Sequence, residues 1–225
     1  IWRQRLETNA VRSTLQRIIP AVGRIEVENH PTLTWVGTGW LIDDNVIVTN
    51  RHVAEAFARQ GAAGFVFRRG WTFDPAPMSA RVDFREERDT TQPNEFRVLD
   101  ILHIEDDDGP DIAFLRVADQ SAAGLQLAGK IQLATDRPER EQFVATIGYP
   151  AADSRVPDQD LVRRIFGDVY NVKRMAPGQL LNPNDDLILH DCSTLGGNSG
   201  SPIVDLESGM AVGLHFSGLF RRENR

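Results

Sequence analysis

The sequence predicts a mainly β protein, a sandwich or a barrel, preceded by a short helical segment. From residue 21 to the end, short runs rich in Val, Ile, Phe and Leu alternate with turn signals. Such a density of short strands at near-regular spacing is typical of an all-β sandwich or barrel. The first twenty residues differ, because their apolar side chains approximate one face of a helix.

The elements follow in order along the chain. The apolar helical face ends at Pro20 and comprises Leu6, Val11, Leu15, Ile18 and Ile19. A second, short helix is expected at 52–60. Strands are expected at 23–28, 34–42, 46–49, 64–68, 80–85, 95–104, 111–117, 142–149, 161–173, 187–192, 201–205 and 210–216. Polar, proline-containing segments at 86–94 and 151–160 are expected to be surface loops, and 118–130 a connector between two halves.

Composition places the chain among ordinary globular proteins. Its 225 residues include 41% hydrophobic and 25% charged residues, and the formal net charge is -7. An acidic balance gives no indication of nucleic-acid binding. No apolar run approaches the roughly 20 residues of a membrane span, and no signal-peptide pattern is visible. We therefore expect neither a nucleic-acid nor a membrane partner.

Cys192, the single cysteine, excludes a disulfide scaffold. With no signal peptide seen, it slightly favours a cytoplasmic location. The chain starts with Ile and stops at FRRENR, which leads us to expect a piece of a longer protein with further domains. No H-E-x-x-H motif and no thiolate cluster is present, so neither a metal site nor a cofactor is expected.

The stretch STLGGNSGSP, residues 193–202, places three glycines around Asn198 and Ser199. Glycine inside a strand costs stability, so a cluster indicates a sharp turn or a close approach of other atoms. One interpretation is a tight turn between two strands. The other is a loop that presents a serine hydroxyl and bare N–H groups to a reacting carbonyl. A nucleophilic serine needs an adjacent base.

Among the histidines, His52 is the best candidate for that base. It follows the apolar run VIVT and opens a short helix, so a rigid strand end presents its ring. His30 precedes Pro31 in a turn, and His103 and His190 lie within strand patterns, where a structural role is favoured.

A third residue should hold the far N–H of the imidazole. Asp111 leads directly into the apolar run IAFLRV, and a desolvated carboxylate needs a partner. The chain order is then His52, Asp111, Ser199. An α/β-hydrolase has the order serine, acid, histidine around a G-x-S-x-G turn. Here Ser201 replaces the last glycine of that pattern, so this class is excluded.

Three segments, GTGWLIDDNVIVTNRHV, GPDIAFLRV and GGNSGSPIV, together with IGYP at 147–150, resemble the trypsin/chymotrypsin-like serine proteases. The similarity is to the bacterial branch with glutamyl endopeptidases and Deg/HtrA-type proteases, and covers residues 20 to 218. It implies two packed six-stranded antiparallel β-barrels with catalytic residues between them. The expected organisation is an N-terminal helical extension (1–20), a first barrel (21–120) and a second barrel (121–225) that is incomplete at its C-terminal end.

The resemblance also implies roles for residues. His52 and Asp111 would come from the first barrel and Ser199 from the second, and the N–H groups of Gly197 and Ser199 would form an oxyanion hole. One such donor contributes about 3 kcal/mol to transition-state stabilisation. Asn198 stands where animal digestive relatives carry an Asp that pairs with a freed N-terminus, so that activation route is not expected.

In the glutamyl endopeptidases, a histidine after the nucleophile and a threonine five residues before it bind an acidic substrate side chain. Here His215 and Thr194 match, and a charged imidazole with a hydroxyl would bind a carboxylate strongly. The alternative is that His215 is a strand residue in a differently shaped pocket. Phe216, Ser217 and Gly218 match the edge that pairs with the substrate backbone.

Two functional hypotheses follow. The first is a serine endopeptidase that acts on protein or peptide substrates through an acyl-enzyme, with a preference for an acidic residue before the scissile bond. The second is a protease-like regulatory or binding module of a larger protein, inactive until a partner completes it. The missing final strand motivates the second, and the complete triad argues for the first.

Overall fold

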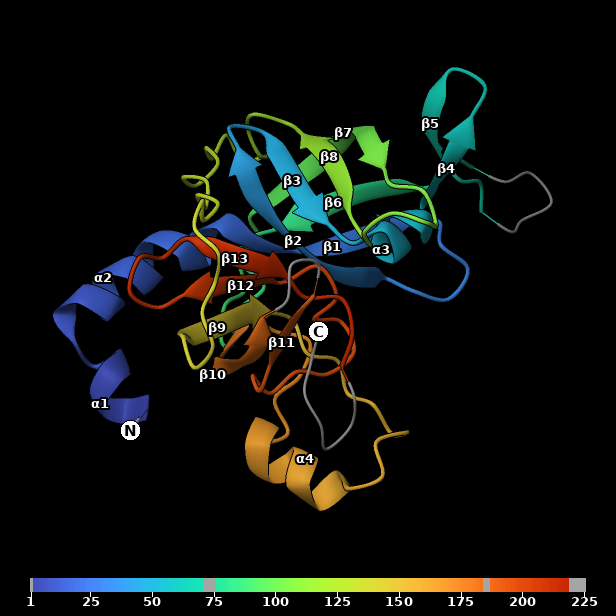
Figure 1. The fold of residues 1–225 in the computed structure, drawn as a ribbon. Coiled ribbons are helices and arrows are strands. Elements are labelled where there is room, and N and C mark those ends of the chain that lie inside the picture. The colour runs from blue at the N-terminus through green and yellow to red at the C-terminus, as the bar shows by residue number, and fades with distance from the viewer. Residues whose placement is uncertain (1, 71–75, 184–186, 219–225) are drawn as a thin grey trace.

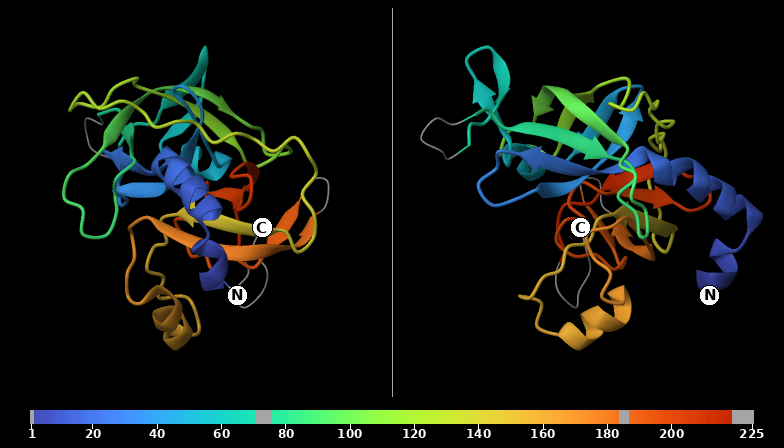
Figure 2. Two further views of the ribbon diagram at one scale, coloured as in Figure 1. Left: turned by 90° about the vertical axis from the view of Figure 1, so that its left-hand side faces the viewer. Right: turned by 180° about the vertical axis from the view of Figure 1, so that it is seen from behind.

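The computed structural model describes residues 2–70, 76–183 and 187–218 of the chain. It is mainly β, as the sequence predicts, with a closed barrel beside a second, curled sheet (Figure 1). Figure 2 shows the barrel above the second sheet, with helices at the N-terminal end and on the far side of the sheet. This arrangement confirms the expected chymotrypsin-like architecture.

The N-terminal segment is helical, as expected. It forms α1 (Trp2–Leu6), α2 (Asn9–Ile18) and the 3-10 turn η1 (Ile19–Ala21). The hydroxyl of Thr8 accepts a hydrogen bond from the Val11 N–H, which caps the start of α2. Leu15 and Ile18 are buried, whereas the other side of α2 faces solvent. The apolar face predicted from the sequence therefore attaches this segment to the molecule.

Six antiparallel strands close into the N-terminal barrel. In the order of their pairing they are β1 (Val22–Glu28), β2 (Trp35–Asp43), β3 (Val46–Thr49), β8 (Ala113–Val117), β7 (Glu95–Ile104) and β6 (Ser79–Asp83). Their inward side chains, such as Ile25, Leu41 and Leu115, are fully buried. A short hairpin of β4 (Ala58–Gly61) and β5 (Gly64–Phe67) projects from the barrel (Figure 1).

The second half forms a five-stranded C-terminal sheet in the part of the chain that the structure describes. The strands pair in the order β11 (Ile188–His190), β10 (Arg174–Pro183), β9 (Phe143–Gly148), β12 (Pro202–Asp205) and β13 (Ala211–Leu214). Residues 219–225, in which the expected incompleteness of this barrel falls, lie outside the described residues.

The sequence-based predictions of two secondary-structure elements were wrong. The strand expected at 161–173 is instead a helix, α4 (Gln159–Phe166), followed by a loop that leads to β10. The Asp158 carboxylate accepts the Leu161 N–H at 2.9 Å and begins the helix, and Gly167 ends it with a left-handed φ of 62°. The helix expected at 52–60 is shorter, because α3 (Arg51–Glu55) is followed by β4.

Buried contacts hold the two halves together. The Tyr149 hydroxyl, fully buried, lies 3.3 Å from the carbonyl oxygen of Asp83 in the N-terminal barrel. The Lys173 ammonium donates to the carbonyl oxygens of Phe84, at 2.7 Å, and Ile19. Burial lowers the pKa of Lys173, against the opposing charge of Glu87. These contacts fix the relative positions of the residues that the two halves contribute to the cleft.

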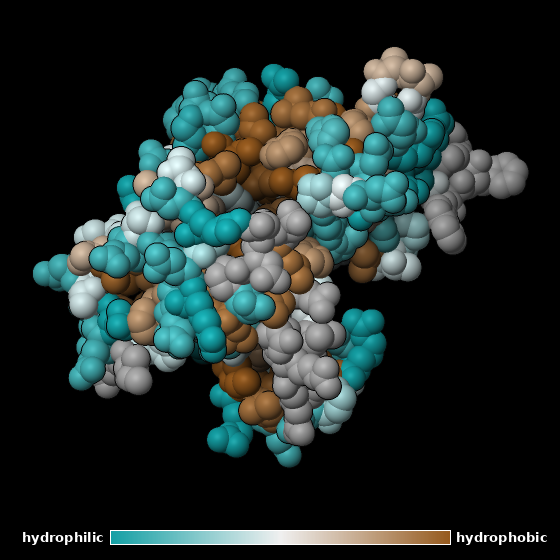
Figure 3. Space-filling view, in the orientation of Figure 1, coloured by the Kyte–Doolittle hydropathy of each residue, from teal (hydrophilic) through white to brown (hydrophobic). Residues whose placement is uncertain are grey.

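Hydrophobic side chains on the face drawn in Figure 3 gather over the barrel strands, and a further group lies on α4.

Over the described residues, none of the helices has the length and apolar character needed to cross a membrane.

Candidate active site

His52 and Asp111 lie side by side because they flank two paired strands. Thr49, the last residue of β3, lies opposite Ala113, the first residue of β8. His52 is the second residue of α3, just after β3, and Asp111 precedes β8, so strand pairing brings them to one end of the barrel. The His52 Nδ1 atom lies 2.6 Å from the Asp111 Oδ2 atom, and the His52 main-chain N–H donates to Oδ1 at 3.0 Å.

Asp111 is held in its ionised form. Burial alone would raise its pKa, but hydrogen bonds from the His52 ring and main chain, with the charge of Arg51, outweigh burial and hold that pKa below its usual value. Because an ionised carboxylate only accepts hydrogen bonds, the His52 proton resides on Nδ1. The Nε2 atom then carries the lone pair that a general base needs.

The loop around Ser199 turns sharply at two glycines. Gly197 and Gly200 have left-handed φ angles of 87° and 86°. A Cβ on Gly197 would collide with the Trp35 ring and the Tyr149 carbonyl oxygen, and one on Gly200 with the backbone of Thr38. Close approach of other atoms therefore explains Gly197 and Gly200, whereas nothing lies within 4 Å of a Cβ at Gly196.

Carbonyl oxygens of this loop accept hydrogen bonds from both halves of the molecule. The Thr38 hydroxyl donates to Gly197 O, and the Thr38 N–H to Ser199 O, each at 2.9 Å. The Ala151 N–H donates to Gly196 O at 2.7 Å. In the trans peptide between Gly196 and Gly197, the Gly197 N–H therefore points away from Ala151.

The Gly197 and Ser199 N–H groups remain available for a ligand, as does the neighbouring Gly196 N–H, among the described residues. The Asn198 N–H donates to Leu195 O, the Gly200 N–H to His215 O. Within the described part of the chain, neither the Gly197 N–H nor the Ser199 N–H donates a hydrogen bond. These are the two donors expected for an oxyanion hole.

Ser199 and the segment of His52 meet across the cleft at Gly37 of β2. A Cβ on Gly37 would lie 2.8 Å from the side chain of Val53, which follows His52, and 3.0 Å from the carbonyl oxygen of Ser199. Only a glycine fits between these two segments. The main chain of Ser199 thus lies close to the segment that carries His52, and among the described residues only the His52–Asp111 pair of the expected triad is joined by a hydrogen bond.

A cavity of about 660 Å³, hereafter the His215 cavity, adjoins Ser199. All of the expected pocket residues line it, namely Thr194, His215, Phe216, Ser217 and Gly218. Leu161 and Ile165 of α4 also line part of its wall. The sequence missed this wall, because the segment was expected to be a strand.

His215 is buried and pairs with a second histidine. Its Nδ1 atom lies 3.2 Å from Nε2 of His190, whose own Nδ1 accepts the Cys192 N–H at 3.3 Å. With Nδ1 as acceptor, neutral His190 carries its proton on Nε2 and donates to His215. Burial lowers the pKa of His190 to about 4. His190 was expected to be structural; its contact with the pocket has no signal in the sequence.

An acidic cluster between the halves is balanced by cations. Carboxylate oxygens of Glu26, Asp83 and Glu86 lie within 4.8 Å of one another. Arg24 and Arg81 pair with Glu26, and Asp83 accepts two main-chain N–H groups. These contacts show that the cluster is part of an ion-pair and hydrogen-bond network.

Comparison with known proteins agrees with this geometry. Residues 37–214 match the family model of the trypsin-like peptidase domain. A probable serine protease from Lysobacter enzymogenes is 29% identical over 230 residues, which cover 91% of this chain and 58% of the relative. The chain thus spans little more than half the length of that relative.

Two solved structures share the fold. The serine endoprotease from Yersinia pestis has a TM-score of 0.60 and 17% identity, covering 96% of this chain and 61% of that one. Deg5 has a TM-score of 0.60 and 19% identity, covering 99% and 89%. The chain belongs to the family of trypsin-like peptidases.

Proposed function

We propose that the protein is a serine endopeptidase in which His52, Asp111 and Ser199 form the catalytic triad. The Ser199 hydroxyl attacks the peptide carbonyl carbon while His52 Nε2 takes its proton. His52 then gives that proton to the leaving amine, and an acyl-enzyme remains. Water, deprotonated by His52, attacks the acyl-enzyme and releases the acid.

The Gly197 and Ser199 N–H groups are proposed to stabilise the oxyanion of each tetrahedral intermediate. The single observation that carries this assignment is the loop in which neighbouring carbonyl oxygens are hydrogen-bonded while these two N–H groups are not. Donors fixed in advance lose no free energy to reorganisation when charge develops.

The pocket supports a preference for an acidic residue before the scissile bond. Thr194 and His215 both line the His215 cavity beside Ser199, and each carries a hydrogen-bond donor. A substrate carboxylate would accept hydrogen bonds from the Thr194 hydroxyl and from an N–H of the His215 imidazole. Physiological substrates are proteins or peptides, and Phe216, Ser217 and Gly218 would pair with their backbone.

The alternative, a regulatory module without its own catalysis, is not favoured by the family match or by the relatives. All three residue types of the triad are present, and His52 and Asp111 are in hydrogen-bonding contact.

A peptide library with and without the Ser199→Ala substitution tests the proposal. We expect cleavage after Glu more often than after Gln, and a loss of at least 1,000-fold in the variant. Ser13→Ala, at an exposed position of α2, serves as the matched control and keeps full activity. Undiminished cleavage by Ser199→Ala would overturn the triad, and equal cleavage after Glu and Gln would overturn the acidic preference. A fluorophosphonate probe should label the wild type at Ser199.

A further inference from the structure

The β4–β5 hairpin carries three arginines around one hollow of the N-terminal barrel. Arg59 lies on β4, and Arg68 and Arg69 directly follow β5. All three are exposed, and all three line a cavity of about 540 Å³, hereafter the Arg68 cavity. Glu55, the last residue of α3, is the one acidic residue that lines it in the described part of the chain. The cavity therefore holds an excess of positive charge in a chain whose formal net charge is -7.

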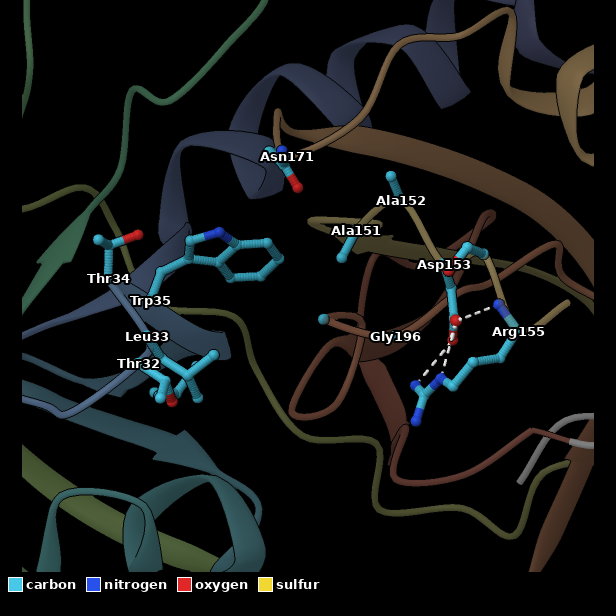
Figure 4. A pocket seen from close by; sticks show the side chains of 13 residues that line it. Thr32, Leu33, Thr34, Trp35, Ala151, Ala152, Asp153, Arg155, Asn171 and Gly196 are labelled. Atoms are coloured by element: carbon cyan, nitrogen blue, oxygen red, sulfur yellow. Dashed lines mark hydrogen bonds and ion pairs between the residues drawn. The ribbon is translucent and has the colours of Figure 1, made fainter.

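These arginines lack the acidic partners that other arginines of the molecule have. Near the loop around Ser199, for example, Arg155 forms a two-point ion pair with Asp153, with both N–O distances 2.8 Å (Figure 4). Over the described residues, none of the three hairpin arginines forms an ion pair. Like charges that share a hollow repel one another, and an anion bound between them removes that repulsion. The unpaired cluster thus indicates a site for a negatively charged ligand.

Arg68 is held in place before any ligand binds. Its Nε atom donates to the carbonyl oxygen of Ala58 at 2.9 Å. Its main-chain N–H donates to Phe57 O, and its carbonyl oxygen accepts the Met78 N–H, each at 2.8 Å. The two terminal nitrogens of its guanidinium group donate no hydrogen bond within the described residues. Because a guanidinium group binds a carboxylate through parallel hydrogen bonds, this fixed orientation reduces the entropy lost on binding.

A second hollow, of about 490 Å³, adjoins the Arg68 cavity, because Arg59 and Arg69 line both. Val66 of β5 and Leu99 of β7 line it with 41% and 46% of their surfaces exposed. Its hydrophobic lining comprises Phe65, Val66, Phe67, Pro77, Leu99 and Ile101. Large hydrophobic side chains gathered at an exposed hollow indicate an interaction site. We call the two hollows together the hairpin face.

We propose that the hairpin face binds an acidic polypeptide segment that carries an apolar side chain beside its carboxylates. The carboxylates pair with the three arginines, and the apolar side chain covers Val66 and Leu99. The face is separate from the proposed specificity pocket, because no described residue lines both it and the His215 cavity. This inference therefore adds a binding site to the proposed function.

A polypeptide suits this face better than a nucleic acid does. A nucleic-acid strand presents a long row of phosphates, which the net negative charge of the chain repels beyond the three arginines. A short peptide segment instead places a few carboxylates and an apolar side chain within the reach of two adjoining hollows. Polypeptides are also the ligands on which trypsin-like peptidases act.

Fluorescence anisotropy tests the proposal on the whole chain with Ser199→Ala, so that the peptide is not cleaved. The probe is a rhodamine-labelled peptide, Gly-Glu-Glu-Glu-Leu-Gly, and the comparison peptide is Gly-Gln-Gln-Gln-Leu-Gly. Arg59→Gln combined with Arg69→Gln should raise the Kd of the acidic peptide about fivefold. Glu55→Gln should lower that Kd about twofold, because a repelling charge is removed from the wall. Leu99→Ala should raise it about threefold, because apolar contact area is lost.

Arg12→Gln combined with Arg116→Gln is the matched control. These two arginines lie exposed on α2 and β8, line neither hollow, and form no ion pair among the described residues. The control removes the same charge from the chain, so its Kd should stay within about twofold of that of the parent.

Equal Kd values for the acidic and the glutamine peptide, or equal Kd values for the hairpin variant and its matched control, would overturn the proposal. Displacement of the peptide by an equal concentration of inorganic phosphate, or of a DNA strand of the same charge, would overturn the choice of a polypeptide. The assay measures binding without cleavage. Its failure therefore leaves the triad intact, and failure of the triad leaves this inference standing.

Discussion

Thr38 donates its hydroxyl hydrogen to the carbonyl oxygen of Gly197 at 2.9 Å, and its N–H bonds Ser199 O at the same distance. Thr38 is fully buried on β2, and its own carbonyl oxygen accepts the Thr49 hydroxyl at 2.7 Å. The barrel that carries His52 thus also orients the loop that carries Ser199. Thr38 is a positioning residue, because it acts through the loop.

Thr38→Val should reduce kcat about tenfold or more with little change in KM. Valine keeps the shape of the side chain but cannot donate to Gly197 O, so the adjacent oxyanion donors lose their fixed direction. Thr38→Ser keeps the hydroxyl and should retain most of the activity. Steady-state kinetics and inhibition by a peptide aldehyde measure the effect, and equal kcat values for the two variants would contradict this role.

Gly197→Ala should reduce kcat/KM about 100-fold and destabilise the fold. A methyl group would collide with the Trp35 ring and the Tyr149 carbonyl oxygen, and φ is left-handed. Gly124 separates the steric collision from the backbone strain. Its φ is also left-handed, at 74°, but nothing lies within 4 Å of a Cβ there. Gly124→Ala should cost only about 1–2 kcal/mol of unfolding free energy. Denaturant unfolding and kinetics of both variants are the measurement; similar losses would contradict the collision.

Most of the fold could be predicted from the sequence because its strands carry regular apolar patterns and turn signals. The prediction was wrong at 161–173, where Val162, Ile165 and Phe166 have helical spacing and Asp158 caps the start. The true strand, β10, contains Pro177 and Gly178, which argue against a strand. Gly178 is needed there because a Cβ would lie 2.6 Å from the Cys192 sulfur.

The candidate triad could be predicted because each member has a local sequence context: a strand end, a buried carboxylate, a glycine cluster. Residues that act through tertiary contacts could not. Thr38 lies within an ordinary strand run, and His190 near a lone cysteine. Their roles follow from tertiary contacts: Thr38 bonds the loop around Ser199, and His190 contacts His215 of the pocket.

The fold should lose stability as the pH falls from 6.5 to 4, partly because of His190. Burial lowers the pKa of this histidine to about 4 from 6.5. In that window the unfolded chain binds a proton that the folded protein does not, so acid favours unfolding, by up to about 3 kcal/mol from this group. Above pH 6.5 both states are neutral and the contribution is constant.

His190→Gln should flatten this dependence. A glutamine amide can accept the Cys192 N–H and donate to His215, but it does not titrate. The free energy of unfolding of the variant should therefore fall less than that of the wild type between pH 6.5 and 4, even where the variant is less stable at pH 7.5. Urea unfolding at a series of pH values measures both slopes. Identical slopes would mean that His190 gains its proton equally in the folded and unfolded states, against the burial and the Cys192 contact seen here.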